Sequence, residues 1–375
     1  MVALHLDPTS TSRPAQARPV RVGIMGATGY VGAELIRLLA RHPHVRIAAL
    51  AARDRDGLAV GAIHPALSST GLHIDGALPP AAELDAAFLA LPHGQGGERA
   101  VDLAGAGVRV IDLGPNFRLS DPADYRRWYG FDHPAPELLP GGPGRPATKD
   151  ARAISAAVYG LPELHRAALP TAGIIASPGC YPTAALLALA PLARSGLIGD
   201  LVVDAKSGLS GAGREPRLGS LFGEADASVS AYGLGGHRHS AELRQELGSL
   251  GAAAEAVAGL VFMPHLVPMA RGILVTCYVR PTREVAQAEL DGLYQATYGD
   301  EPFVQAAEEA PATKSVTGSN LARVHARLDE ASGRIITFGA IDNLVKGAAG
   351  QAIQAFNLAF GLPETAGLEQ LPLYP

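Results

Sequence analysis

Short apolar runs alternate with amphipathic stretches through the first half of the chain. The apolar runs predict strands at residues 20–25, 45–51, 86–91, 108–113 and 173–176. Amphipathic stretches with helical spacing follow the first and third of these runs, at residues 33–40 and 97–106. Because strands that alternate with helices form parallel sheets covered by those helices, this half predicts a doubly wound α/β domain.

The second half has longer strand candidates, at residues 201–207, 260–263, 272–279, 323–328 and 334–341. Helices are predicted directly after Cys180 and at 347–361. Several of these strands can join an antiparallel or mixed sheet, which is typical of an α+β domain. We therefore predict a boundary near Ala176, with the chain divided into a tail at 1–19, a nucleotide-type domain at 20–176, an α+β domain at 177–345 and a C-terminal segment at 346–375.

Composition excludes several classes of protein. Among 375 residues, 31 Lys and Arg stand against 36 Asp and Glu, and the net charge of −5 provides no basic field for nucleic acid. No apolar run approaches the roughly 18 to 20 residues that span a bilayer. The two cysteines cannot build a disulfide framework, and no Cys or His spacing suggests a metal site. We expect a cytoplasmic enzyme, and a disordered tail at residues 1–19, which lack the apolar core of a signal peptide.

Four glycines at three-residue spacing, from Gly23 to Gly32, separate the first strand from the first helix. Exposed N–H groups at a helix start attract phosphate, and glycine lets a pyrophosphate approach closely, so this turn predicts a Rossmann-like dinucleotide-binding domain. After the second strand, Arg53 and Arg55 suit the 2′-phosphate of NADP. Alternatively, both arginines are solvated and Asp54 holds the ribose.

Cys180 lies between an apolar strand and an apolar helical run, within Ser177 to Thr183. A thiol at the positive end of a helix dipole has a lowered pKa, which favours the thiolate. Cys180 is therefore a candidate nucleophile, although a structural role is also open. Cys277 lies inside a predicted strand and is expected to pack as a small apolar residue.

Two histidines flank an arginine in the polar, glycine-rich segment 235–242. A thiolate nucleophile needs a neighbour that exchanges protons near neutral pH, and either His237 or His239 can serve.

Three further segments are suited to anions or to a nicotinamide carboxamide. Residues 204–214 combine glycine N–H groups, hydroxyls and two cations, and Arg118 follows another strand. Segment 341–350, which contains Asn343, is a strand-to-helix turn rich in polar groups and small residues. Tight turns with solvated charges are the alternative for the first two.

Together these motifs resemble those of the N-acetyl-gamma-glutamyl-phosphate reductases, NADPH-dependent enzymes of arginine biosynthesis in the semialdehyde dehydrogenase superfamily. The resemblance runs from Val20 to the C-terminus and rests on GATGY at 26–30, LPHG at 91–94, YGLPE at 159–163, PGCYPT at 178–183, residues 207–214, HRH at 237–239, PHLVPM at 264–269 and DNLVKG at 342–347. It implies that Cys180 is the nucleophile and His237 the acid/base. It also implies that the C-terminal helix returns to the NADP-binding domain.

The resemblance further implies a small acyl-phosphate substrate, a thioacyl intermediate, NADP as the cofactor, no metal, and a homodimer or homotetramer. The α+β domain is then the catalytic and dimerisation domain. The residues expected to contact the substrate or its phosphate are Arg118, Ser210, Arg214, His239 and Glu242. Those expected to contact the cofactor are Gly26, Thr28, Gly29, Tyr30, Val31, Arg53, Pro92, Gly211 and Asn343.

Two departures from the family pattern are Asn116, where aspartate is common, and Ala52, where a hydroxyl residue is usual. Related alternatives are the carrier-protein-linked aminoadipyl-phosphate reductase of lysine biosynthesis and aspartate-semialdehyde dehydrogenase. The net charge of −5 gives no basic field for an acidic carrier protein. A dinucleotide-sensing regulator would need the glycine turn but neither the cysteine segment nor the histidine segment.

Overall fold

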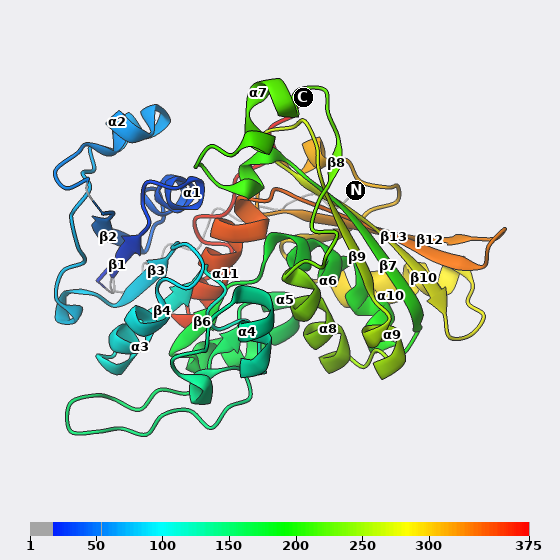
Figure 1. Ribbon diagram of the computed structural model, residues 1–375, viewed down its shortest axis with the longest axis horizontal. Helices are drawn as coiled ribbons and strands as arrows, with labels where there is room; N and C mark the ends of the chain where they lie inside the picture. The colour runs from blue at the N-terminus through cyan, green and yellow to red at the C-terminus, as the bar shows by residue number, and fades with distance from the viewer. Residues whose placement is uncertain (1–17, 54, 375) are drawn as a thin grey trace, which may run out of the picture.

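The strands form two sheets in the computed structural model, which describes residues 18–53 and 55–374 (Figure 1). The expected tail at 1–19 lies almost wholly outside these residues, as does Asp54. The first sheet is parallel throughout, in the order β2-β1-β3-β4-β6-β5. Its strands are β1 Val20–Met25, β2 Val45–Ala51, β3 Ala86–Leu89, β4 Arg109–Asp112, β5 Val158–Tyr159 and β6 Ile174–Ala176. The predicted doubly wound parallel sheet is confirmed.

The second sheet mixes parallel and antiparallel pairs in the order β11-β12-β13-β10-β7-β9-β8. Only β7–β9 and β11–β12 are parallel among its pairs in the described residues. This arrangement confirms the α+β prediction for the second half. Its strands are β7 Ile198–Ser207, β8 Ser230–Ala231, β9 Val261–Leu266, β10 Ile273–Pro281, β11 Val304–Ala306, β12 Ala322–Asp329 and β13 Arg334–Ile341.

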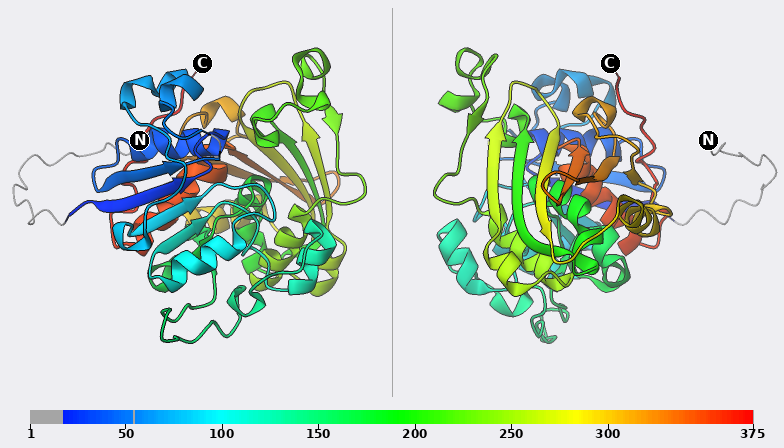
Figure 2. Two further views of the ribbon diagram at one scale, coloured as in Figure 1. Left: turned by 60° about the vertical axis from the view of Figure 1, so that its left-hand side comes forward. Right: turned by 90° about the vertical axis from the view of Figure 1, so that its right-hand side faces the viewer.

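Helices cover the first sheet and one side of the second (Figure 2). The longer helices of the first half are α1 Tyr30–Leu39, α3 Gly97–Gly105 and α4 Pro122–Tyr129, with the short α2 Val60–Ile63 and α5 Pro162–His165. The second half contains α6 Cys180–Arg194, α8 His239–Ser249, α10 Gln287–Tyr298 and α11 Gly350–Ala359, with the short α7 Phe222–Ala225 and α9 Ala254–Ala258.

Helix α6 is the centre of the core under the second sheet. Every residue from Tyr181 to Ala193 is buried, because α6 packs against β10, β13 and α8 at once. A helix that is apolar on all sides is stable only in such an enclosed position. The first turn of α6, which begins at Cys180, therefore belongs to a helix that is packed on several sides.

The C-terminal segment differs in detail from the single predicted helix. Residues Val345–Ala349 form a π-helical turn, and the α-helix α11 follows it. Ile353 and Phe356 of α11 share a core with Ile24 of β1 and Leu35 of α1. Single π-helical turns are uncommon and often occur at functional sites.

Candidate active site

The glycine turn between β1 and α1 is shaped as a cradle. Gly26 has φ +84°, and a Cβ there would lie 2.2 Å from the carbonyl oxygen of Ala90. Gly29 is the N-cap of α1, and no side chain among the described residues caps this helix start. The first N–H groups of α1, at Tyr30 and Val31, lie at the carboxyl end of β1, where open α/β sheets bind ligands. These features fit the pyrophosphate of a dinucleotide.

The second half of the chain reaches this turn through the side chain of Arg214. The Arg214 guanidinium donates to the carbonyl oxygens of Thr28 and Ile63, at 2.9 and 3.2 Å. Asn343 Nδ2 donates to Ser210 Oγ at 2.9 Å. The structure therefore brings together Arg214 with Thr28, and Ser210 with Asn343.

Two of the remaining predicted cofactor residues follow strands of the first sheet, and Gly211 follows β7 of the second. Pro92 follows β3, and Arg53 is exposed just after β2. Gly211 packs closely, because a Cβ there would lie 2.8 Å from Ser207 Oγ.

Cys180 is the first residue of α6, immediately after the N-cap Gly179. Cys180 is partly buried, and the π-helical turn packs closely on it, since a Cβ on Gly347 would lie 2.9 Å from Cys180 Cβ. Burial raises the pKa of this thiol, although the charges of Arg118 and Arg238 lower it in part. The pKa lowering expected from the helix dipole is therefore overturned by desolvation.

His237 and His239 stand together beside this helix start. Their ring centroids are 4.6 Å apart, and His239 Nε2 lies 2.5 Å from the position of a Cβ on Gly179. Burial, followed by the charge of Arg238, lowers the pKa of His237 to about 4. His237 Nδ1 accepts the backbone N–H of His239 at 3.2 Å, so the neutral ring carries its proton on Nε2. His237 is thus neutral at pH 7, with a hydrogen-bond donor to offer.

Glu242 and Arg118 form a buried pair behind the cysteine. Glu242 Oε1 accepts from the N–H of Gly179 at 2.6 Å and from the hydroxyl of Tyr159 at 2.7 Å. Arg118 donates to the carbonyl oxygens of Ser177 and Leu113 at 2.7 and 3.0 Å, and its Nη1 lies 3.6 Å from Glu242 Oε2. These contacts with the protein favour a positioning role over the substrate contact expected for both residues.

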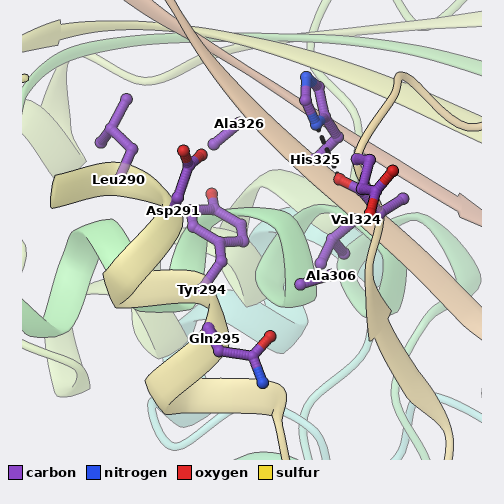
Figure 3. A pocket seen from close by; sticks show the side chains of 10 residues that line it. Leu290, Asp291, Tyr294, Gln295, Ala306, Val324, His325 and Ala326 are labelled. Atoms are coloured by element: carbon purple, nitrogen blue, oxygen red, sulfur yellow. Dashed lines mark hydrogen bonds between the residues drawn. The ribbon is translucent and has the colours of Figure 1, made fainter. Parts of the chain in front are cut away.

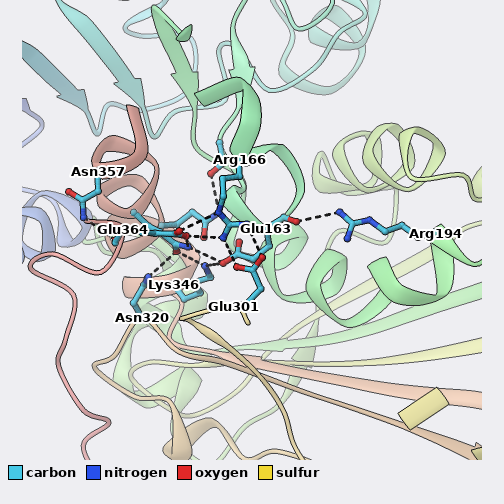
Figure 4. Close-up of polar contacts among 11 residues, drawn as sticks. Glu163, Arg166, Arg194, Glu301, Asn320, Lys346, Asn357 and Glu364 are labelled. Atoms are coloured by element: carbon cyan, nitrogen blue, oxygen red, sulfur yellow. Dashed lines mark hydrogen bonds and ion pairs between the residues drawn. The ribbon is translucent and has the colours of Figure 1, made fainter. Parts of the chain in front are cut away.

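A second buried ion pair fixes the π-helical turn (Figure 4). Lys346 Nζ lies 2.6 Å from Glu163 Oε1 and 2.7 Å from Gln354 Oε1, and both charged side chains are fully buried. Around this pair, Arg166 binds Glu301 and Glu364. Sequence patterns gave no sign of this network, because its members come from segments that are distant along the chain.

The sequence prediction missed Arg127 and Trp128, two of the residues around a cavity of about 390 Å³ beside His237. Its lining comes from the end of α4 and the loop before α8 and consists of Arg127, Trp128, Gly235, Gly236, His237 and Arg238. Helix α4 carried a recognisable start signal, since Asp121 caps it and Pro122 opens it. Its approach to His237 is a tertiary contact that no local pattern encodes.

Another cavity, of about 290 Å³, lies between α10, β11 and β12 and contains none of the predicted site residues (Figure 3). In the described part of the chain, no group of three or more His, Cys, Asp or Glu side chains is placed to hold a metal ion. The helices at 18–53 and 55–374 include none that is long and apolar enough to cross a membrane.

Comparison with known proteins identifies two matching family models. Residues 21–172 match the NAD-binding domain of semialdehyde dehydrogenases, and residues 180–343 match their dimerisation domain. Curated N-acetyl-gamma-glutamyl-phosphate reductases from Laribacter hongkongensis and Dehalococcoides mccartyi are 45% and 44% identical to this chain. Each comparison covers 95% of this chain and 99–100% of the relative. The resemblance predicted from the motifs is confirmed.

Solved structures share the fold at lower identity. Aspartate semialdehyde dehydrogenase II from Vibrio cholerae, complexed with ASA, has a TM-score of 0.65 at 17% identity and covers 92% of this chain and 99% of its own. A probable aspartate-semialdehyde dehydrogenase from Pseudomonas aeruginosa has a TM-score of 0.66 at 18% identity, with the same coverage.

Proposed function

The chain belongs to the semialdehyde dehydrogenase family, and from this premise we propose that it reduces N-acetyl-gamma-glutamyl phosphate to N-acetylglutamate 5-semialdehyde and phosphate, with NADPH as reductant. One observation carries the proposal: named reductases match 95% of the chain at 43–45% identity. The reaction is a step of arginine biosynthesis. We place the enzyme in the cytoplasm as a homodimer or homotetramer, consistent with two free cysteines and a dimerisation domain.

The residues present fit a dinucleotide. The uncapped start of α1 and the Gly26 turn suit the pyrophosphate, while Asn343 and Gly211 suit the nicotinamide end. Arg53, which is exposed beyond β2, suits the 2′-phosphate. When bound, the reduced cofactor supplies a hydride.

Cys180 is the proposed nucleophile. Its Sγ forms a bond to the acyl carbon, the bond from that carbon to the phosphate oxygen breaks, and the thiol proton leaves with the phosphate. The product is a thioester, which accepts hydride more readily than an oxygen ester. The Nε2–H of neutral His237 donates to the oxygen that becomes negative when hydride arrives. Collapse of this adduct releases the aldehyde and regenerates the thiolate, which takes up one proton.

Arg118 and Glu242 hold the helix start in place during these steps. Because Glu242 binds the N–H of Gly179, it fixes the residue that precedes the nucleophile. Arg118 binds the carbonyl oxygen of Ser177, three residues before the nucleophile. Such supporting contacts keep a reacting atom within a fraction of an ångström of its productive position.

The test is the reverse reaction with NADP and phosphate, followed by NADPH absorbance. The kcat/KM for N-acetylglutamate 5-semialdehyde should be roughly 10- to 200-fold higher than that for its aminoadipate analogue, which has one more methylene. Equal or higher values for the aminoadipate or aspartate semialdehydes would assign the alternative activity.

Omitting phosphate should trap the acyl group on the enzyme. Mass spectrometry should find the adduct on the peptide that contains Cys180, and Cys180→Ser should form none. Cys277→Ser is the matched control, because Cys277 is fully buried in β10 and its pKa is raised to about 12 by burial. An adduct on Cys277 would falsify the proposed mechanism.

A further inference from the structure

The cavity beside His237 brings two arginines and a tryptophan to the active site. Arg127 and Trp128 come from the last turn of α4, and Arg238 directly follows His237. The guanidinium carbon of Arg127 lies 5.0 Å from the Trp128 ring. A Cβ on Gly236 would lie 3.1 Å from that indole, so the loop backbone packs against the aromatic face.

In the part of the chain that the structure describes, the Nε–H of Arg238 lacks the kind of acceptor that the Nε–H groups of Arg118 and Arg126 have. The Arg238 Nε is buried and has no hydrogen-bond partner in the described residues. Arg118, by contrast, donates to two carbonyl oxygens and faces Glu242, and Arg126 pairs with Asp132 at 2.6 Å. A buried donor without an acceptor is costly, so this N–H is suited to a group that arrives with the substrate.

The position of Arg238 strengthens the argument for an anion. It is the N-cap of α8, an eleven-residue helix whose first peptide N–H groups already carry partial positive charge. The hydroxyl of Tyr129, on α4, is also buried and makes no hydrogen bond to the residues that the structure describes. Both observations point to an acceptor group between α4 and the start of α8.

The shape of the cavity distinguishes between the two anionic ends of the proposed substrate. A phosphate group needs donors on several sides and little apolar surface, whereas this cavity of about 390 Å³ has an indole wall and a glycine backbone. The acyl tail combines an acetyl methyl, an amide and a carboxylate, which match an aromatic wall bordered by guanidinium groups.

We propose that Arg238 binds the α-carboxylate of the acyl substrate, with Trp128 and Arg127 forming the wall against its acetamido group. Arg238 thereby selects substrates whose tail ends in a carboxylate, and it leaves the phosphate to other groups. This assignment rests on the proposed function, because it takes its ligand from that reaction.

The reverse reaction tests the assignment, because semialdehyde and phosphate are then separate substrates. Arg238→Gln should raise the KM for N-acetylglutamate 5-semialdehyde by about 10- to 100-fold, as expected for loss of a charge-assisted hydrogen bond. The KM for phosphate should change by less than about twofold, because in this assignment Arg238 makes no hydrogen bond to phosphate. Arg238→Lys should recover part of the loss, since it keeps the charge without the planar fork.

Arg126→Gln is the matched control. Arg126 precedes the cavity residue Arg127 on α4, but it pairs with the exposed Asp132 and does not line the cavity. Its Michaelis constants should equal those of the wild type. A higher KM for phosphate alone, for both substrates, or for neither would overturn the assignment. A wild-type enzyme that is inactive on this semialdehyde would instead overturn the proposed function, so the two failures are distinguishable.

Discussion

Lys346→Met is expected to destabilise the protein strongly, because it removes the cation from a fully buried ion pair. Removing one partner from such a pair typically costs about 3–5 kcal/mol, since the other charge stays buried without a counter-ion. For a domain of 150–250 residues, 1 kcal/mol corresponds to roughly 2–4 °C in Tm, so the midpoint should fall by roughly 6–20 °C.

The loss should depend on pH in a defined direction. Burial alone would raise the pKa of Glu163, but the charge and hydrogen bond of Lys346 hold it below its ordinary value. A depressed pKa gives stability that is present above the unfolded pKa of about 4.3 and is lost as the pH falls through the folded value. In the variant the uncompensated burial raises the pKa of Glu163. The difference from the wild type should therefore be largest near pH 7 and should shrink toward pH 5.

Thermal and urea unfolding followed by circular dichroism at pH 7 and pH 5 measure both effects. The double variant Lys346→Met with Glu163→Gln should regain most of the stability, because no charge is left buried. Arg166→Gln is the control, since Arg166 belongs to the same network but its side chain is 38% exposed, and its cost should stay below about 1 kcal/mol. An equal loss at both pH values, or a double variant as unstable as the single one, would refute the electrostatic argument.

Three further experiments test the active site. Alkylation of Cys180 by iodoacetamide in the free enzyme should keep rising through pH 8, because burial raises the thiol pKa, and a plateau below pH 7 would contradict this. His237→Asn should lower kcat by about 10² to 10⁴ in steady-state assays, and a large loss in His239→Asn with almost none in His237→Asn would exchange the two roles. Arg53→Ala should raise the KM for NADPH far more than that for NADH, whereas equal shifts would remove Arg53 from the 2′-phosphate site.

Local patterns were sufficient to predict most of the first sheet. Strands β1 and β2 agree with the predicted ranges because each is an apolar run bounded by turn residues. Strand β5 was missed because it has two residues, too few to show a period. Helix α1 begins at Tyr30, three residues earlier than its amphipathic stretch, because the backbone turn at Gly26 and Gly29 sets its start.

The candidate site likewise contains residues that local patterns predict and residues that they do not predict. The sequence predicts Cys180 and His237 as site residues because each carries a reactive group in a segment of unusual local composition. The sequence marks Arg238 only as the residue between two histidines, and it gives no signal for Trp128. Their importance depends on the contact between the end of α4 and the loop before α8, and a single sequence holds no period or spacing that reports such a contact.

The pKa of Cys180 is shifted in the direction opposite to the one that the helix dipole predicts. The helix dipole acts on this thiol as a fraction of a charge, and the carboxylate of Glu242 at the N–H of Gly179 opposes it. Desolvation exceeds both, and a sequence gives no measure of it. With a thiol pKa raised by burial and a His237 pKa of about 4, the resting pair is neutral rather than an ion pair. In the proposed mechanism the proton therefore leaves Sγ during attack, when the departing phosphate can accept it, and the resting cysteine stays protonated until substrate arrives.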